Sequence, residues 1–139
     1  MRVLPLILAA FLAACATRPP QPVEIEPTDM CAFCKMAISE KRYAAELIDA
    51  GRNVFKFDDI GCMVHFAEQR RWIAQPPVRF VHDYDTSEWL EAGRASFVLS
   101  PEIPSPMASG LLAVRDHARA EQYAARFHGR VRSLGDLWK

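Results

Sequence analysis

The chain has 139 residues, and its 17 lysine and arginine residues are balanced by 17 aspartate and glutamate residues. A neutral chain without a basic patch gives no sign of nucleic-acid binding, so this class of partner is excluded. Half of the residues are hydrophobic, a composition that favours one folded domain over a disordered chain.

The N-terminus is typical of a bacterial lipoprotein. Arg2 precedes an apolar run that ends at Ala14, and this run is too short for a permanent membrane helix but suits a secretory signal peptide. The run closes with Leu-Ala-Ala-Cys, which resembles the lipobox, the site where the signal peptide is cut and the cysteine receives its lipid. We therefore expect residues 1–14 to be a signal peptide and Cys15 to be lipidated. Ala16 in place of aspartate favours the outer membrane, with the protein facing the periplasm.

The next segment, residues 15–28, predicts a tether. It offers few residues for burial and contains four prolines, at Pro19, Pro20, Pro22 and Pro27. In the polyproline II conformation each residue extends by about 3.1 Å, so the tether would span roughly 40 Å. A domain anchored in this way could reach a soluble partner.

Three sulfur-containing residues follow within six positions, as Cys31-Ala32-Phe33-Cys34-Lys35-Met36. Thiolate and thioether sulfurs are soft ligands, which favour Cu(I) over hard cations. A Cys-x-x-Cys pair also fits structural zinc or, in an oxidising compartment, a disulfide between Cys31 and Cys34. The methionine two residues after Cys34 favours copper.

The remaining sequence, within a domain of residues 29–139, predicts two similar halves. The first half, at about 43–84, shows the pattern of a hairpin, a helix with an aspartate cap and a third strand, over residues 44–49, 54–57, 58–72 and 78–82. The second half, at about 95–134, repeats this order over residues 95–99, 110–115, 116–128 and 131–133. Residues 83–94 between them predict a helical turn. The fold class is therefore α+β, with two tandem ββαβ units.

Two further sulfur residues lie in this body. Cys62 falls in the first turn of the predicted helix that follows Asp58 and Asp59. We expect one of these aspartates to cap the helix, and the helix N-terminus to lower the pKa of the thiol. Met107 lies in a loop of proline and small residues, where it has little reason to be a core residue. Both are candidate ligands.

Two alternatives to a copper site stay open. His65 lies three residues after Cys62, and together with Cys31 and Cys34 the pair would make a Cys3His site for structural zinc. The other alternative is an enzyme, either a thiol-disulfide oxidoreductase or an activity similar to organomercurial lyase. Oxidoreductases of the thioredoxin type place Cys-x-x-Cys at a helix N-terminus after a strand, whereas here the motif follows a proline-rich segment.

Taken together, these motifs resemble the NosL family, whose members are periplasm-facing lipoproteins encoded with nitrous oxide reductase. The resemblance rests on the lipobox and on the segments Met30–Met36, Phe57–Met63 and Ser105–Gly110. It implies a fold of two strand-strand-helix-strand units, similar to the core of organomercurial lyase. It also implies binding of Cu(I) and its delivery to the copper-sulfide cluster of nitrous oxide reductase through an ABC-type membrane complex.

The Cys-x-Met pair of that family falls on Cys34 and Met36 of this chain. We therefore predict a Cu(I) metallochaperone and not an enzyme, with Cys34 and Met36 as ligands and with further ligands from Cys31, Cys62 and Met107. The Phe-Asp-Asp-Ile-Gly-Cys segment belongs to a branch that also occurs outside dedicated denitrifiers, so the expected client is nitrous oxide reductase or a related copper protein.

Overall fold

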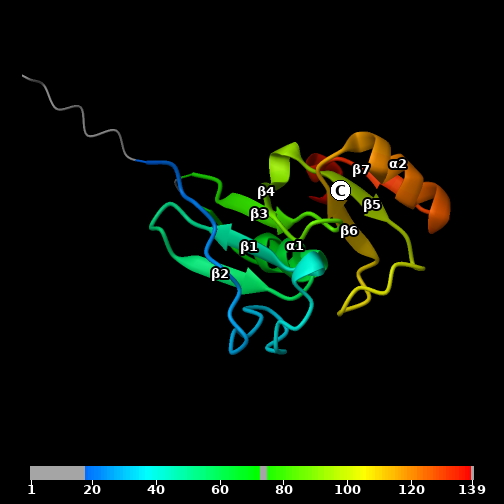
Figure 1. Ribbon diagram of the computed structural model, residues 1–139. Helices are drawn as coiled ribbons and strands as arrows, with labels where there is room; N and C mark the ends of the chain where they lie inside the picture. Colours follow the sequence, from blue (N-terminus) through cyan, green and yellow to red (C-terminus); the bar gives the residue numbers. More distant parts are fainter. Residues whose placement is uncertain (1–17, 73–74, 139) are drawn as a thin grey trace, which may run out of the picture.

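The computed structural model describes residues 18–72 and 75–138, which form two antiparallel sheets and two α-helices (Figure 1). The predicted signal peptide and Cys15 lie outside these residues. Among the residues described, no helix combines the length and the apolar character needed to span a bilayer.

The first unit is a four-stranded sheet with the strand order β2-β1-β3-β4. Alternate residues of a strand face opposite sides of its sheet. On the central strand, Ala45 and Leu47 join the core with α1, whereas Glu46 faces the other side, where it meets the N-terminal segment. The elements are β1 (Ala45–Ile48), β2 (Val54–Phe57), α1 (Ile60–Glu68), β3 (Val78–His82) and β4 (Trp89–Glu91).

The second unit repeats this arrangement with the strand order β6-β5-β7, so the first strand of each unit is central. Both helices begin in the same way: Asp59 accepts the Gly61 N–H and Asp116 accepts the Ala118 N–H, each at 2.7 Å. The elements are β5 (Ser96–Leu99), β6 (Leu111–Val114), α2 (His117–Arg126) and β7 (Arg130–Arg132). The predicted α+β class with two strand-strand-helix-strand units is confirmed.

Two local predictions are wrong. The sequence predicts that the first helix continues to about residue 72, but α1 ends at Glu68, and the Trp72 indole N–H turns back to the Ala67 carbonyl at 3.3 Å. For residues 83–94 the sequence predicts only a helical turn. They instead contain β4 followed by a 3-10 turn at Ala92–Arg94, because Trp89 pairs with His82 across the sheet and the two rings lie 3.7 Å apart.

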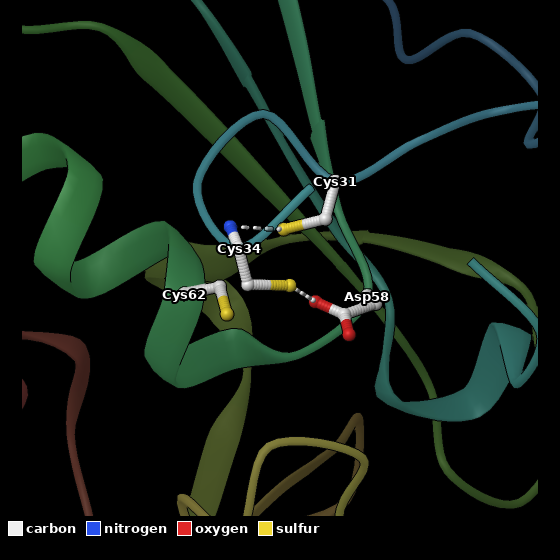
Figure 2. A group of neighbouring side chains, drawn as sticks. All are labelled: Cys31, Cys34, Asp58 and Cys62. Carbon is white, nitrogen blue, oxygen red and sulfur yellow. Dashed lines mark hydrogen bonds between the residues drawn. The ribbon is translucent and has the colours of Figure 1, made fainter. Parts of the chain in front are cut away.

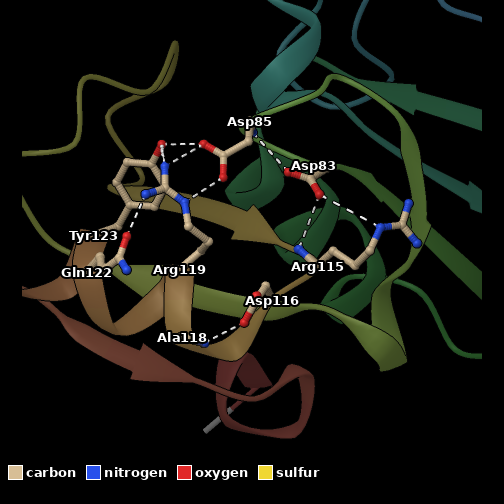
Figure 3. Close-up of polar contacts among 8 residues, drawn as sticks. All are labelled: Asp83, Asp85, Arg115, Asp116, Ala118, Arg119, Gln122 and Tyr123. Carbon is tan, nitrogen blue, oxygen red and sulfur yellow. Dashed lines mark hydrogen bonds and ion pairs between the residues drawn. The ribbon is translucent and has the colours of Figure 1, made fainter.

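The two units are joined by polar contacts around the chain that leaves β3 (Figure 3). Asp85 accepts two hydrogen bonds from the Arg119 guanidinium, both at 2.9 Å, and a third from the Tyr123 hydroxyl. Arg119 and Tyr123 lie on α2. Arg119 lowers the pKa of Asp85 below its usual value of 3.8. This carboxylate therefore ties the second unit to the connection between β3 and β4 of the first unit.

Replacing Asp85 with asparagine is expected to lower the free energy of unfolding at pH 7 by about 1 kcal/mol, since a bidentate charged pair at a partly exposed site is lost. A carboxyl with a lowered pKa stabilises the fold above its unfolded value and loses that contribution on acidification. The difference between variant and wild type should therefore shrink below about pH 4, as urea titrations at several pH values would show. Glu121→Gln, at an exposed i,i+4 pair with His117, is the control and should change little; an equal loss in both variants would contradict the prediction.

Residues 18–26, which we call the strap, lie along the outer face of the first sheet and cross β1 and β2 (Figure 1). Ile25 in the strap is 3% exposed. The hydrogen bonds that join the strap to the strands and their turn are those of Val23 with Glu46, Lys56 with Glu24, and Arg52 with Arg18. In the described part of the predicted tether, the strap is thus docked on the first sheet, because its apolar and backbone groups find partners there.

Candidate metal site

The loop Cys31–Met36, which we call the thiol loop, is closed by its own backbone. The Cys31 N–H donates to the Met36 carbonyl at 2.8 Å, and the Lys35 N–H returns to the Cys31 carbonyl at 3.1 Å. Lys35 adopts a φ of 64°, which turns the chain inside the loop. The Ala32 N–H fixes the loop to β2 by donating to the Lys56 carbonyl at 2.8 Å. The loop is therefore held beside the C-terminal end of β2, close to the start of α1.

The start of α1 supplies the other side of the site. Asp59 caps the helix, and its second oxygen accepts the Met107 N–H at 2.9 Å, so the loop before β6 docks here. Gly61 allows this close approach, because a Cβ at this position would lie 2.5 Å from the Ser109 Cβ. Cys62 follows in the first turn and is 3% exposed.

Three thiols and one carboxylate converge where these segments meet (Figure 2). The Sγ atoms of Cys31, Cys34 and Cys62 and a carboxylate oxygen of Asp58 all lie within 4.8 Å of one another. The Cys34 thiol donates to Asp58 Oδ1 at 3.3 Å. In the described residues all three cysteines are free thiols, so the alternative disulfide between Cys31 and Cys34 is not formed. We call this group the thiol cluster.

The thiols differ in their electrostatic environment. Hydrogen bonds from the Cys62 thiol and from the backbone N–H groups of Asp58 and Cys34 lower the pKa of Cys31 to about 6. The same contact with Cys31, together with burial, raises the pKa of Cys62, and burial raises the pKa of Cys34 to about 11. The expected lowering of the Cys62 pKa by the helix N-terminus is therefore wrong, since its neighbour Cys31 takes the thiolate form first. Among the three thiols, Cys31 is therefore the one whose thiolate form its surroundings favour.

The structure brings together three of the five predicted copper ligands, Cys31, Cys34 and Cys62. The side chains of Met36 and Met107 lie on the segments that frame the cluster and are 59% and 46% exposed. The alternative Cys3His set is not formed, because His65 is not part of the group. It instead stacks on Phe33, with ring centroids 5.7 Å apart, and pairs with Glu68.

Asp58 is the group member that the sequence did not reveal. The Asp58-Asp59 pair indicates a helix cap, but only Asp59 caps α1. Asp58 is 3% exposed and points to Cys34. The sequence does contain one indication of this role: an N-cap needs only one aspartate, so the second aspartate of the pair has another function.

The second unit lacks such a site at the matching position. Relative to the two caps, Arg115 corresponds to Asp58 and Arg119 corresponds to Cys62. Arg115 and Arg119 engage carboxylates, Asp83 and Asp85 among them. At these matching positions the first unit carries soft sulfur donors, whereas the second unit carries arginines that form ion pairs. Of the two positions, only the one in the first unit can therefore bind a thiophilic metal.

Comparison with known proteins identifies both a similar fold and a family. The fold is similar to that of the crystal structure of the copper chaperone NosL from Shewanella denitrificans, with a TM-score of 0.75 and 20% sequence identity over 86% of this chain and 96% of that chain. No match was found among curated proteins. The family model for NosL matches residues 22–139. This match takes in the thiol loop, the start of α1 and both sheets, and by it the chain belongs to the NosL family.

Proposed function

We propose that this protein is a metallochaperone that holds Cu(I) in the thiol cluster and passes it to a copper-accepting client. The observation that carries the proposal is the convergence of three free thiols, from segments about 30 residues apart, within 4.8 Å. Sulfur is the preferred donor for Cu(I). Cys31, whose pKa is lowered by the Cys62 thiol and by backbone N–H groups, is the thiol best suited to form the first metal bond.

The burial of the thiols suits transfer by ligand exchange. Cys31 and Cys62 are 0% and 3% exposed, whereas Cys34 is half-buried and is the sulfur that an incoming ligand can displace. Met36 and Met107, on the segments that frame the cluster, remain predicted thioether ligands. The carboxylate of Asp58 is a hard donor and adds little to a Cu(I) site. Copper would thus move from sulfur to sulfur without entering the solvent as a free ion.

We further propose that the protein is anchored by a lipid on Cys15 and faces the periplasm from the outer membrane. The lipobox-like sequence supports this location. Family membership supports nitrous oxide reductase, or a related copper protein, as the client and an ABC-type membrane complex as an intermediate partner.

A structural zinc site is the second candidate, and one observation favours it. Asp58 completes a set of four donors, and three cysteines with a carboxylate can bind Zn²⁺ tetrahedrally. Zinc in this role would be needed for folding and would resist exchange.

One experiment separates the two candidates. The full-length chain is loaded anaerobically with Zn²⁺, titrated with Cu(I), and followed by metal analysis and X-ray absorption. For a chaperone we expect one Cu(I) per chain, bound by sulfur, with Zn²⁺ displaced and with copper passed on to metal-free nitrous oxide reductase. Retention of one Zn²⁺ in the presence of Cu(I), with loss of the fold on chelation, would overturn the proposal in favour of structural zinc.

A further inference from the structure

A carboxylate is buried beneath the strap. Glu46 lies on the central strand β1 and is 0% exposed. Its two oxygens accept the Val23 N–H of the strap at 3.0 and 3.2 Å. Burial penalises the ionised form of a carboxyl group much more than its neutral form. The strap therefore covers a group that favours water whenever it is charged.

The charged groups near Glu46 do not offset this penalty. Lys56 is its neighbour on β2, but the ammonium group donates to the Glu24 carbonyl and to the Asp29 carboxylate. The neighbour on β3 is the apolar Phe80. Burial is the largest effect on Glu46 and raises its pKa from 4.5 to about 7. The Val23 N–H and the charge of Lys56 favour the ionised form but only reduce this rise, and the carboxylates of Asp29 and Glu24 add repulsion.

The strap is also coupled to the thiol loop through Lys56. Its ammonium group donates to the Glu24 carbonyl of the strap at 2.6 Å and pairs with Asp29, two residues before the thiol loop. Its carbonyl accepts the Ala32 N–H inside that loop at 2.8 Å. One residue of β2 thus holds both the strap and the loop that carries Cys31 and Cys34.

We propose that Glu46 is a positioning residue for the metal site: neutral Glu46 holds the strap on the sheet, and its ionisation releases the strap and loosens the thiol loop. The role in copper handling rests on the function proposed above, whereas the release itself does not. A pKa of about 7 in the docked state, against 4.5 for a free carboxyl, means that the docked state binds the proton more tightly. Docking is therefore strongest at low pH and weakens as the pH rises towards 7. Release would also add about 3.1 Å of reach for each residue freed.

Hydrogen exchange followed by NMR on the metal-free, full-length chain tests this proposal. Protection factors, which remove the intrinsic pH effect on exchange, are compared at pH 5 and pH 8. We expect the protection of the Val23 and Ala32 amides to fall at least tenfold between these values in the wild type. In Glu46→Gln, which stays neutral at both pH values, protection should not change. Glu26→Gln is the matched control, since Glu26 is an exposed acid on the same strap, and it should show the fall of the wild type.

A pH-independent protection factor in the wild type, or an unchanged fall in Glu46→Gln, would overturn the proposal. If Glu46→Gln does not fold, Val23→Pro removes the N–H donor without altering the sheet. It should lower the protection of Ala32 at pH 5 to the level of the wild type at pH 8, and full protection of Ala32 in this variant would also overturn the proposal. Because the measurement is made without metal, a failure to bind copper would refute the proposed function and leave this result standing.

Discussion

Replacing Cys62 with serine is expected to lower the affinity for Cu(I) by at least about a hundredfold, since the loss of outer-sphere partners alone commonly costs 10- to 100-fold. Cys62 provides one of the three clustered sulfurs and the hydrogen bond that favours the Cys31 thiolate. Its replacement removes a soft donor and weakens the preference of the neighbouring sulfur for the charged form. Competition with a Cu(I) chelator of known affinity would measure the loss.

Two nearby residues serve as controls for this substitution. His65→Ala removes an exposed side chain that lies outside the thiol cluster, and Met63→Leu changes a fully buried core residue with nearly the same volume. Both variants should bind Cu(I) within about threefold of the wild type, because no sulfur of the cluster is lost. A loss in His65→Ala as large as that in Cys62→Ser would contradict the assigned ligands and would restore the Cys3His arrangement.

Replacing Gly110 with alanine is expected to destabilise the fold by about 3 kcal/mol or more, through backbone strain and steric conflict. Gly110 has a φ of +70°, and a Cβ at this position would lie 2.2 Å from the Ser100 carbonyl oxygen and 2.9 Å from its carbon. The clash is with the backbone of Ser100, which is itself fixed: the Ser100 N–H donates to the Gly110 carbonyl at 2.9 Å and so closes the loop from β5 to β6. The clash cannot be relieved by rotating a side chain. Urea denaturation would measure the change as a lower midpoint.

Gly93→Ala is the matched control for this prediction. A Cβ at Gly93 would meet no atom within 4 Å, so the free energy of unfolding should stay within about 0.5 kcal/mol of the wild type. An equally mild effect at Gly110 would show that the loop can move away from Ser100. It would then contradict the tight closure that presents Met107 to the cap of α1.

Secondary structure could be predicted from the sequence wherever short-range signals were strong. The caps Asp59 and Asp116 and the apolar positions of the helices mark where α1 and α2 begin. The strand at Trp89–Glu91 was missed because its three residues acquire strand character only by pairing with β3. Propensity in so short a segment is weak, and cross-strand contacts decide its conformation.

The candidate site was only partly predictable for the same reason. The spacing of Cys31 and Cys34 indicates one soft-metal site, since thiols three residues apart on a turn can converge. Cys62 could be proposed as a ligand but not placed, and the choice of Asp58 instead of His65 as the fourth donor depends on which way the chain enters α1. Sequence spacing cannot determine this direction, because it is fixed by the packing of β2 and of the 105–109 loop against the helix.

By itself, the sequence determined that this chain carries a soft-sulfur motif behind a lipoprotein-like N-terminus and repeats a strand-strand-helix-strand unit. These features depend on residue type and on local periodicity. Only the tertiary structure decided that Cys62 and Asp58 join the motif, that the strap covers Glu46, and that arginines occupy the matching positions of the second unit. Each of these results depends on segments distant in sequence that strand pairing and helix packing bring within a few ångströms, and the burial that shifts the pKa values of Cys31 and Glu46 exists only after that packing has formed.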